Sequence, residues 1–83
     1  MAHAEGHNTL AAGKCSHTEG VETKAGYAAH AEGSGTYAKF GSHAEGEKTE
    51  ALGNYSHAEG SNTMSKGPNS HAEGTMTIAK GKS

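Results

Sequence analysis

Small and large side chains alternate in two short stretches that return throughout the chain. In residues 42–46 (SHAEG), positions 42, 44 and 46 are small and share one side of an extended strand, while His43 and Glu45 share the other. In residues 49–53 (TEALG), positions 49, 51 and 53 are again small, opposite Glu50 and Leu52. This period of two residues predicts β-strands. Small residues on the inner side of both strands predict two strands that lie very close together.

The two stretches belong to a repeat whose length is 13 or 14 residues. Its template is S-H-A-E-G-x-x-T-x-A-x-G-x-x, and six units begin at His3, His17, His30, His43, His57 and His71. The His, Glu and Gly of the HAEG motif and the Thr six residues after the His are present in every unit. Two heptads of helix would fit a 14-residue period, but two glycines per unit disfavour a helix.

Each unit therefore predicts one coil, built as strand, turn, strand and turn. Six coils stacked at about 4.8 Å give a height of about 29 Å. The predicted fold is all-β: a narrow parallel β-roll solenoid of six 13–14-residue coils with two short strands per coil, a single segment over residues 1–83. The 13-residue units lose one residue in the second turn, where Gly26 and Gly41 stand one place out of register.

The composition supports a repetitive backbone over a conventional core. Hydrophobic residues are 31% of the 83-residue chain, and 14 of those 26 residues are Ala, while Gly contributes 13 more positions. A net charge of −2 without any Arg argues against nucleic-acid binding. No apolar stretch approaches the roughly 20 residues that span a bilayer, and no signal-peptide pattern opens the chain. We therefore expect no membrane insertion by this segment.

The outward positions of the two strands differ in their variability. The first strand presents only His and Glu, in all six units. The second strand presents a mixed set that we expect to face solvent or a partner: Leu10, Lys24, Tyr37, Glu50, Met64 and Ile78. A face that is the same in every coil is expected to meet something equally regular, and another copy of the chain is the simplest candidate.

The SHAEGxxTxAxGxx unit resembles the YadA-like, or haemagglutinin-type, head repeat of trimeric autotransporter adhesins. That repeat usually has Val and Ile where this chain has His and Glu, and the His/Glu form is similar to repeat arrays in phage and prophage tail-fibre proteins. The resemblance covers residues 2–83. It implies a left-handed β-roll that forms a homotrimer about a threefold axis. It also implies an extracellular place on a bacterial cell surface or a virion tail, for attachment or as a rigid spacer.

Carried over to this sequence, the resemblance places the constant face at the trimer interface. The interface residues would be His3, Glu5, His17, Glu19, His30, Glu32, His43, Glu45, His57, Glu59, His71 and Glu73. A polar interface of this kind must be hydrogen-bonded throughout to be tolerated. The partners implied are two further copies of the chain and a receptor on a host surface or in the extracellular matrix. We expect the segment to belong to a longer fibrous protein that carries the anchor and the export signal.

Three other interpretations of the repeated residues were weighed. Catalysis by the His-x-Glu pair needs one site with a cleft, and six equivalent pairs offer none, so we expect no catalytic residue, no cofactor and no enzyme activity. A metal site is the lower-ranked alternative at the same His residues, because three chains around an axis could bring three imidazoles together. Ice binding needs an exposed Thr array, whereas this Thr column is expected to face inward: Thr9, Thr23, Thr36, Thr49, Thr63 and Thr77.

The favoured interpretation is that each His donates to a Glu of a neighbouring chain. Such pairing would neutralise two columns of charge whose stacked Glu residues would otherwise repel at about 4.8 Å. It would raise the pKa of the His and lower the pKa of the Glu. Cys15 is the single cysteine and is expected to be an unpaired surface thiol in a turn.

Overall fold

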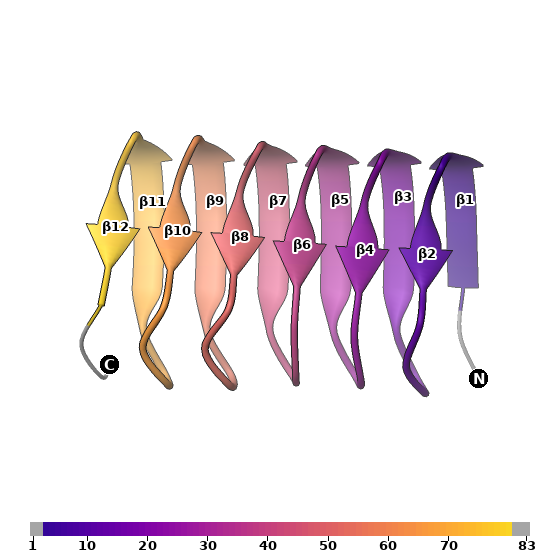
Figure 1. Cartoon of the computed structure of the whole chain (residues 1–83), viewed down its shortest axis with the longest axis horizontal. Helices are drawn as coiled ribbons and strands as arrows, with labels where there is room; N and C mark the ends of the chain where they lie inside the picture. Colours follow the sequence, from indigo (N-terminus) through magenta and orange to yellow (C-terminus); the bar gives the residue numbers. More distant parts are fainter. Residues whose placement is uncertain (1–2, 81–83) are drawn as a thin grey trace.

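The structure, a computed structural model, describes residues 3–80 and consists of six stacked coils (Figure 1). Each coil contributes one strand of five residues and one strand of two. The long strands are β1 (His3–His7), β3 (His17–Val21), β5 (His30–Ser34), β7 (His43–Glu47), β9 (His57–Ser61) and β11 (His71–Thr75). The short strands are β2 (Leu10–Ala11), β4 (Lys24–Ala25), β6 (Tyr37–Ala38), β8 (Glu50–Ala51), β10 (Met64–Ser65) and β12 (Ile78–Ala79).

The two kinds of strand form two separate six-stranded parallel sheets, which lie back to back. In Figure 1 the long strands behind point up and the short strands in front point down, while the chain advances from right to left. This path is a left-handed coil, as expected. The Cα atoms extend over 30 × 21 × 10 Å, so the predicted height of about 29 Å and the narrow cross-section are both confirmed.

Successive coils pair in strict register, so that identical residues stand next to each other. His43 is opposite His30 on one side and His57 on the other, and the Ala, Glu and Gly of the motif follow the same rule. The 13-residue coils keep this register because their deletion lies in the second turn, where residues 26–29 form a shorter turn than residues 52–56. The predicted position of the deletion is therefore confirmed.

The interior contains only small side chains. Ala31, Ala44 and Ala58 of the long strands face Ala25, Ala38 and Ala51 of the short strands, and all six are fully buried. The largest fully buried side chains are Thr and one Ser. In the 14-residue coils Ser16, Ser56 and Ser70 each donate from Oγ to the carbonyl of the Gly three residues earlier, at 2.6, 2.6 and 2.5 Å. The hydroxyls of these three buried Ser side chains thus find hydrogen-bond partners on the backbone of their own turns.

The glycine of the HAEG motif does not face inward, which corrects the prediction for position 46. Gly46 is exposed, and its φ of +115° breaks the two-residue alternation after Glu45. The same left-handed value, from +113° to +115°, recurs in all six coils. A Cβ on Gly46 would lie only 2.0 Å from the carbonyl oxygen of Gly60 in the next coil. Glycine is therefore required both by the backbone angle and by the contact between coils.

Replacing Gly46 with Ala should destabilise the roll far more than the same change at Gly74. Both glycines have the left-handed φ, which costs about 1–3 kcal/mol for a residue with a Cβ. At Gly74 the nearest atom to the added Cβ is Thr77 Cγ2 at 3.6 Å, an ordinary contact, whereas at Gly46 it is backbone at 2.0 Å. Urea unfolding followed by circular dichroism measures both variants. Equal losses of stability would contradict the importance of the contact between coils.

Candidate functional site: the His/Glu face

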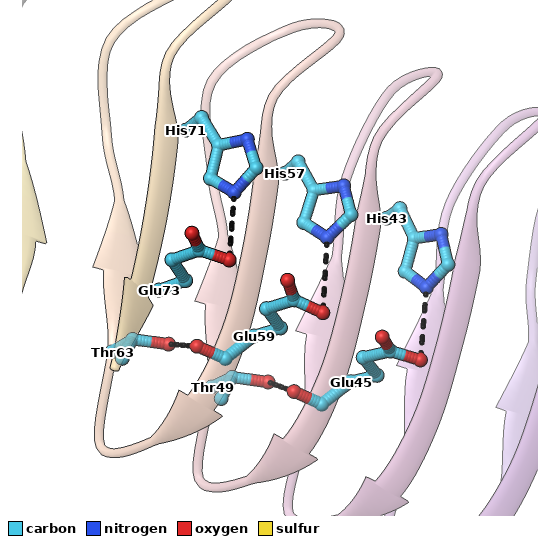
Figure 2. Close-up of polar contacts among 8 residues, drawn as sticks. All are labelled: His43, Glu45, Thr49, His57, Glu59, Thr63, His71 and Glu73. Carbon is cyan, nitrogen blue, oxygen red and sulfur yellow. Dashed lines mark hydrogen bonds and ion pairs between the residues drawn. The ribbon is translucent and has the colours of Figure 1, made fainter. Parts of the chain in front are cut away.

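The constant face lies on the outer side of the long-strand sheet. Its first and third strand positions form a histidine column and a glutamate column, together called the His/Glu face. The histidine column is His3, His17, His30, His43, His57 and His71, and the glutamate column is Glu5, Glu19, Glu32, Glu45, Glu59 and Glu73. Figure 2 shows three adjacent coils, in which each imidazole stands above the carboxylate of its own coil. The structure thus brings together all twelve residues that the sequence singled out.

The imidazole rings form one continuous stack. Neighbouring ring centroids are 4.6–4.8 Å apart, and the angles between ring planes range from 3° to 17°. The parallel register sets this spacing, because each ring stands on the same position of successive strands. The result is a flat ladder of rings that runs the length of the roll.

Each His also faces the Glu two residues later in its own strand. The distance from His Nε2 to the nearer carboxylate oxygen is 3.4–3.7 Å in all six coils. This exceeds the roughly 2.7–2.9 Å of a charge-assisted hydrogen bond, so the contact is not a well-aligned hydrogen bond and is an ion pair only when the imidazole is protonated. Each His therefore lies beside a carboxylate of its own chain, and hydrogen bonding to a Glu of a neighbouring chain stays a prediction. Thr49 and Thr63 donate to the main-chain oxygens of Glu45 and Glu59 from inside (Figure 2).

Four histidine nitrogens are shielded from solvent and have no hydrogen-bond partner. They are Nε2 of His17, His30, His43 and His57. The side chains of these four coils are about one-third exposed, at 31–39%, against 52–63% in the two terminal coils. The central part of the face is thus half-buried by its own neighbours and retains unused hydrogen-bonding capacity.

The pKa shifts of the carboxyl groups alternate in direction along the glutamate column from Glu19 to Glu73. Side-chain hydrogen bonding with Glu32 and Glu59 lowers the pKa of Glu45 to about 2. The same kind of hydrogen bonding raises the pKa of Glu32 and of Glu59, and it lowers the pKa of Glu19 and of Glu73. Carboxylates stacked in register repel, so every second one holds its proton more tightly and donates to its neighbours. The lowering expected from pairing between chains stays a prediction, and within the single chain the pKa of Glu32 and of Glu59 is raised.

His43, at the centre of the stack, has a lowered pKa. Burial of the ring is the largest cause, and positive charge on His30 and His57 lowers the pKa further. The ion pair with Glu45 acts in the opposite direction but is weaker. Within the single chain the imidazole column therefore opposes its own protonation, and the rise in pKa expected from pairing between chains stays a prediction.

An open groove of about 810 Å³ runs beside the glutamate column. Its walls are the Glu and Gly residues of successive coils: Glu5, Gly6, Glu19, Gly20, Glu32, Gly33, Glu45, Gly46, Glu59 and Gly60. The groove exists because the exposed glycines carry no side chain next to the carboxylates. Sequence reasoning missed it, since the glycines were assigned to the interior.

The remaining predicted positions lie where the sequence suggested. The outward residues of the short strands are exposed or half-buried, and Lys24 Nζ lies 5.4 Å from the ring centroid of Tyr37. Cys15 is exposed and unpaired. Thr23, Thr36, Thr49 and Thr63 are buried, which removes the regular exposed Thr array that ice binding would use.

An aromatic ridge in the second turns was not predicted. The rings of Tyr27 and Phe40 stack at 5.2 Å, and Tyr55 meets Phe40 edge-on at 5.5 Å. All three side chains are exposed. The sequence leaves them open between contact residues and scattered surface groups: Tyr27 and Phe40 lie ten residues after the preceding His, and Tyr55 lies twelve residues after it. Counting backward from the next His places them two or three residues before it, which is the signal that would have revealed the ridge.

Comparison of this chain with family models, with curated proteins and with solved structures found no match. Among residues 3–80 there is no helix of the length and apolar character needed to cross a membrane.

Acidification from about pH 7.5 to about 5.5 should destabilise the fold through His43. Its folded pKa lies below the ordinary value of 6.5, so the unfolded chain binds more protons and stability falls as the pH drops below 6.5. The urea midpoint measured across this range should fall, and His43→Gln should flatten the dependence. His7→Gln, outside the column, is the matched control. A midpoint that rises on acidification would indicate the raised His pKa that pairing between chains predicts.

Proposed function

We propose that this chain is a non-enzymatic structural and attachment module that associates as a homotrimer through the His/Glu face. The observation that carries the proposal is that this face is identical in all six coils, flat and only about one-third exposed in its centre, whereas the outer face of the short strands varies. A face that contacts the same surface in every coil must keep the same residues in every coil, whereas the opposite face is free to vary.

The thin interior supports association. With nothing larger than Thr or Ser fully buried, one chain has little apolar surface to offset the entropy of ordering its backbone. A threefold arrangement would cover three His/Glu faces at once. The shielded Nε2 atoms of the central coils have no hydrogen bond, and a carboxyl of a second copy is a suitable partner.

The variable face suits display. The short strands hold Leu10, Lys24, Tyr37, Glu50, Met64 and Ile78 on a rigid ladder, and three copies would present each side chain three times. Repeated weak contacts of this kind gain affinity through multivalency. Together with the resemblance of the repeat, this favours an extracellular head or shaft of a bacterial surface adhesin or of a phage tail fibre. Its partner would be a receptor on a host surface or in the extracellular matrix.

Sedimentation equilibrium at neutral pH should give a mass near three times 8.4 kDa. Glu32→Lys/Glu45→Lys reverses two charges on the face and should shift the mass toward that of one chain. Glu22→Lys/Glu47→Lys makes the same charge change at two exposed positions, one in the turn after β3 and one at the end of β7, and should leave the trimer intact. Position 22 tolerates Lys, because Lys48 occupies the equivalent place with the same φ. A folded wild-type monomer, verified by circular dichroism, would overturn the proposal.

A further inference from the structure

The His/Glu face contains groups of two imidazoles and one carboxylate whose ligand atoms converge. In each group the atoms lie within 4.8 Å of one another, and each group joins one coil to the next. Four such groups are present among the described residues: His3–Glu5–His17, His17–Glu19–His30, His30–Glu32–His43 and His57–Glu59–His71. Two imidazoles with one carboxylate are a ligand set suited to zinc and to other late first-row divalent ions.

The separation within each His–Glu pair fits one tetrahedral metal ion. Zinc binds imidazole nitrogen and carboxylate oxygen at about 2.0–2.2 Å, so two ligands at the tetrahedral angle are about 3.4 Å apart. The Nε2 to carboxylate distances at Glu5, Glu32 and Glu59 are 3.4–3.6 Å. The pair would therefore accept an ion almost without moving. The second imidazole must tilt toward the first, because stacked rings 4.6–4.8 Å apart hold their nitrogens too far apart for one ion.

The groups cannot all be filled together, because an imidazole nitrogen binds one ion. One pairing of coils uses every histidine of the column once: coils one and two, three and four, five and six. All three of its groups are among those that converge. The other pairing leaves His3 and His71 unused, and its second group, around Glu45, does not converge within the same distance. The geometry thus selects one of the two pairings.

We propose that the His/Glu face binds three zinc-class divalent ions per chain, one for each pair of coils, with Glu5, Glu32 and Glu59 as the carboxylate ligands. The shielded Nε2 atoms that have no hydrogen bond supply unused lone pairs where an ion would sit. The open groove borders all three of these carboxylates and provides a path of entry. Water completes the fourth position, since each group supplies three protein ligands.

The proposal does not require trimer formation. Every ligand of a site comes from one chain, so three ions are expected for the monomer. An Nε2 atom that donates to a carboxyl of a second copy cannot also bind an ion, so zinc is expected to compete with such contacts at the central coils. Sedimentation of the metal-free protein tests association, and metal stoichiometry tests the sites, so that either result can fail without the other.

The test is native mass spectrometry and isothermal titration calorimetry of the full chain with Zn²⁺, in a Cys15→Ser background that removes the exposed thiol. Two double variants each remove two imidazoles. His30→Gln/His43→Gln removes both histidines of one site, whereas His43→Gln/His57→Gln removes one histidine from each of two sites. His7→Gln is the control for a histidine outside the column. Circular dichroism verifies that each variant keeps the β-fold.

The expected stoichiometry is three ions per chain for the background and for His7→Gln, two for His30→Gln/His43→Gln, and one for His43→Gln/His57→Gln. Equal losses in the two double variants would overturn the pairing of coils, and with it the proposal. Absence of saturable zinc binding, or three ions bound by both double variants, would also overturn it. If the double variants unfold, Glu32→Gln replaces them: it keeps every imidazole and should reduce the stoichiometry to two.

Discussion

The in-register contact between successive coils is the constraint on which the rest of this structure depends. A parallel ladder repeats at one strand spacing, and the coils meet so closely that a single added Cβ at Gly46 would overlap the carbonyl of Gly60. Two sheets held about 10 Å apart at most leave room only for Ala, Ser and Thr. The sequence can therefore be poor in large apolar residues and still have one defined fold, because backbone hydrogen bonds replace most of a side-chain core.

The same register creates the chemistry of the outer face. Once His stands on His and Glu on Glu, like charges are forced to a distance of one strand spacing, which is unfavourable when both are ionised. The structure relieves this in two ways. The pKa values of neighbouring carboxyl groups are lowered and raised in alternation. Burial and the neighbouring imidazoles lower the pKa of His43 at the centre of the stack. The pKa values on this face are thus set by the stacking of like residues in register more than by any single His–Glu contact.

Much of the fold was predictable because the repeat makes periodicity visible within one chain. The His spacing gave the coils, the two-residue alternation gave the strands, and the missing residue in the 13-residue units indicated the turn that changes length. The error at Gly46 arose because the assignment of alternate residues to opposite faces of a strand assumes an extended backbone. Gly46 has a left-handed φ and leaves the alternation, so the exposed groove beside Glu45 was missed. The sequence left Tyr27, Phe40 and Tyr55 open between contact residues and scattered groups, because they lie in turns where the two-residue alternation does not apply.

The two proposed uses of the His/Glu face draw on the same physical property. The in-register stack of strands fixes side-chain positions without a large core. It can therefore hold three groups of metal ligands with the same geometry, or it can present one flat surface to identical copies. Both uses need imidazoles whose Nε2 lacks an internal partner, as in the four central coils. If an ion occupies a pair of coils, it neutralises a carboxylate that otherwise competes with its neighbours for protons. Metal uptake would then relieve repulsion along the column, but it would occupy the Nε2 atoms that a second copy could contact, so the two uses compete for the same imidazoles.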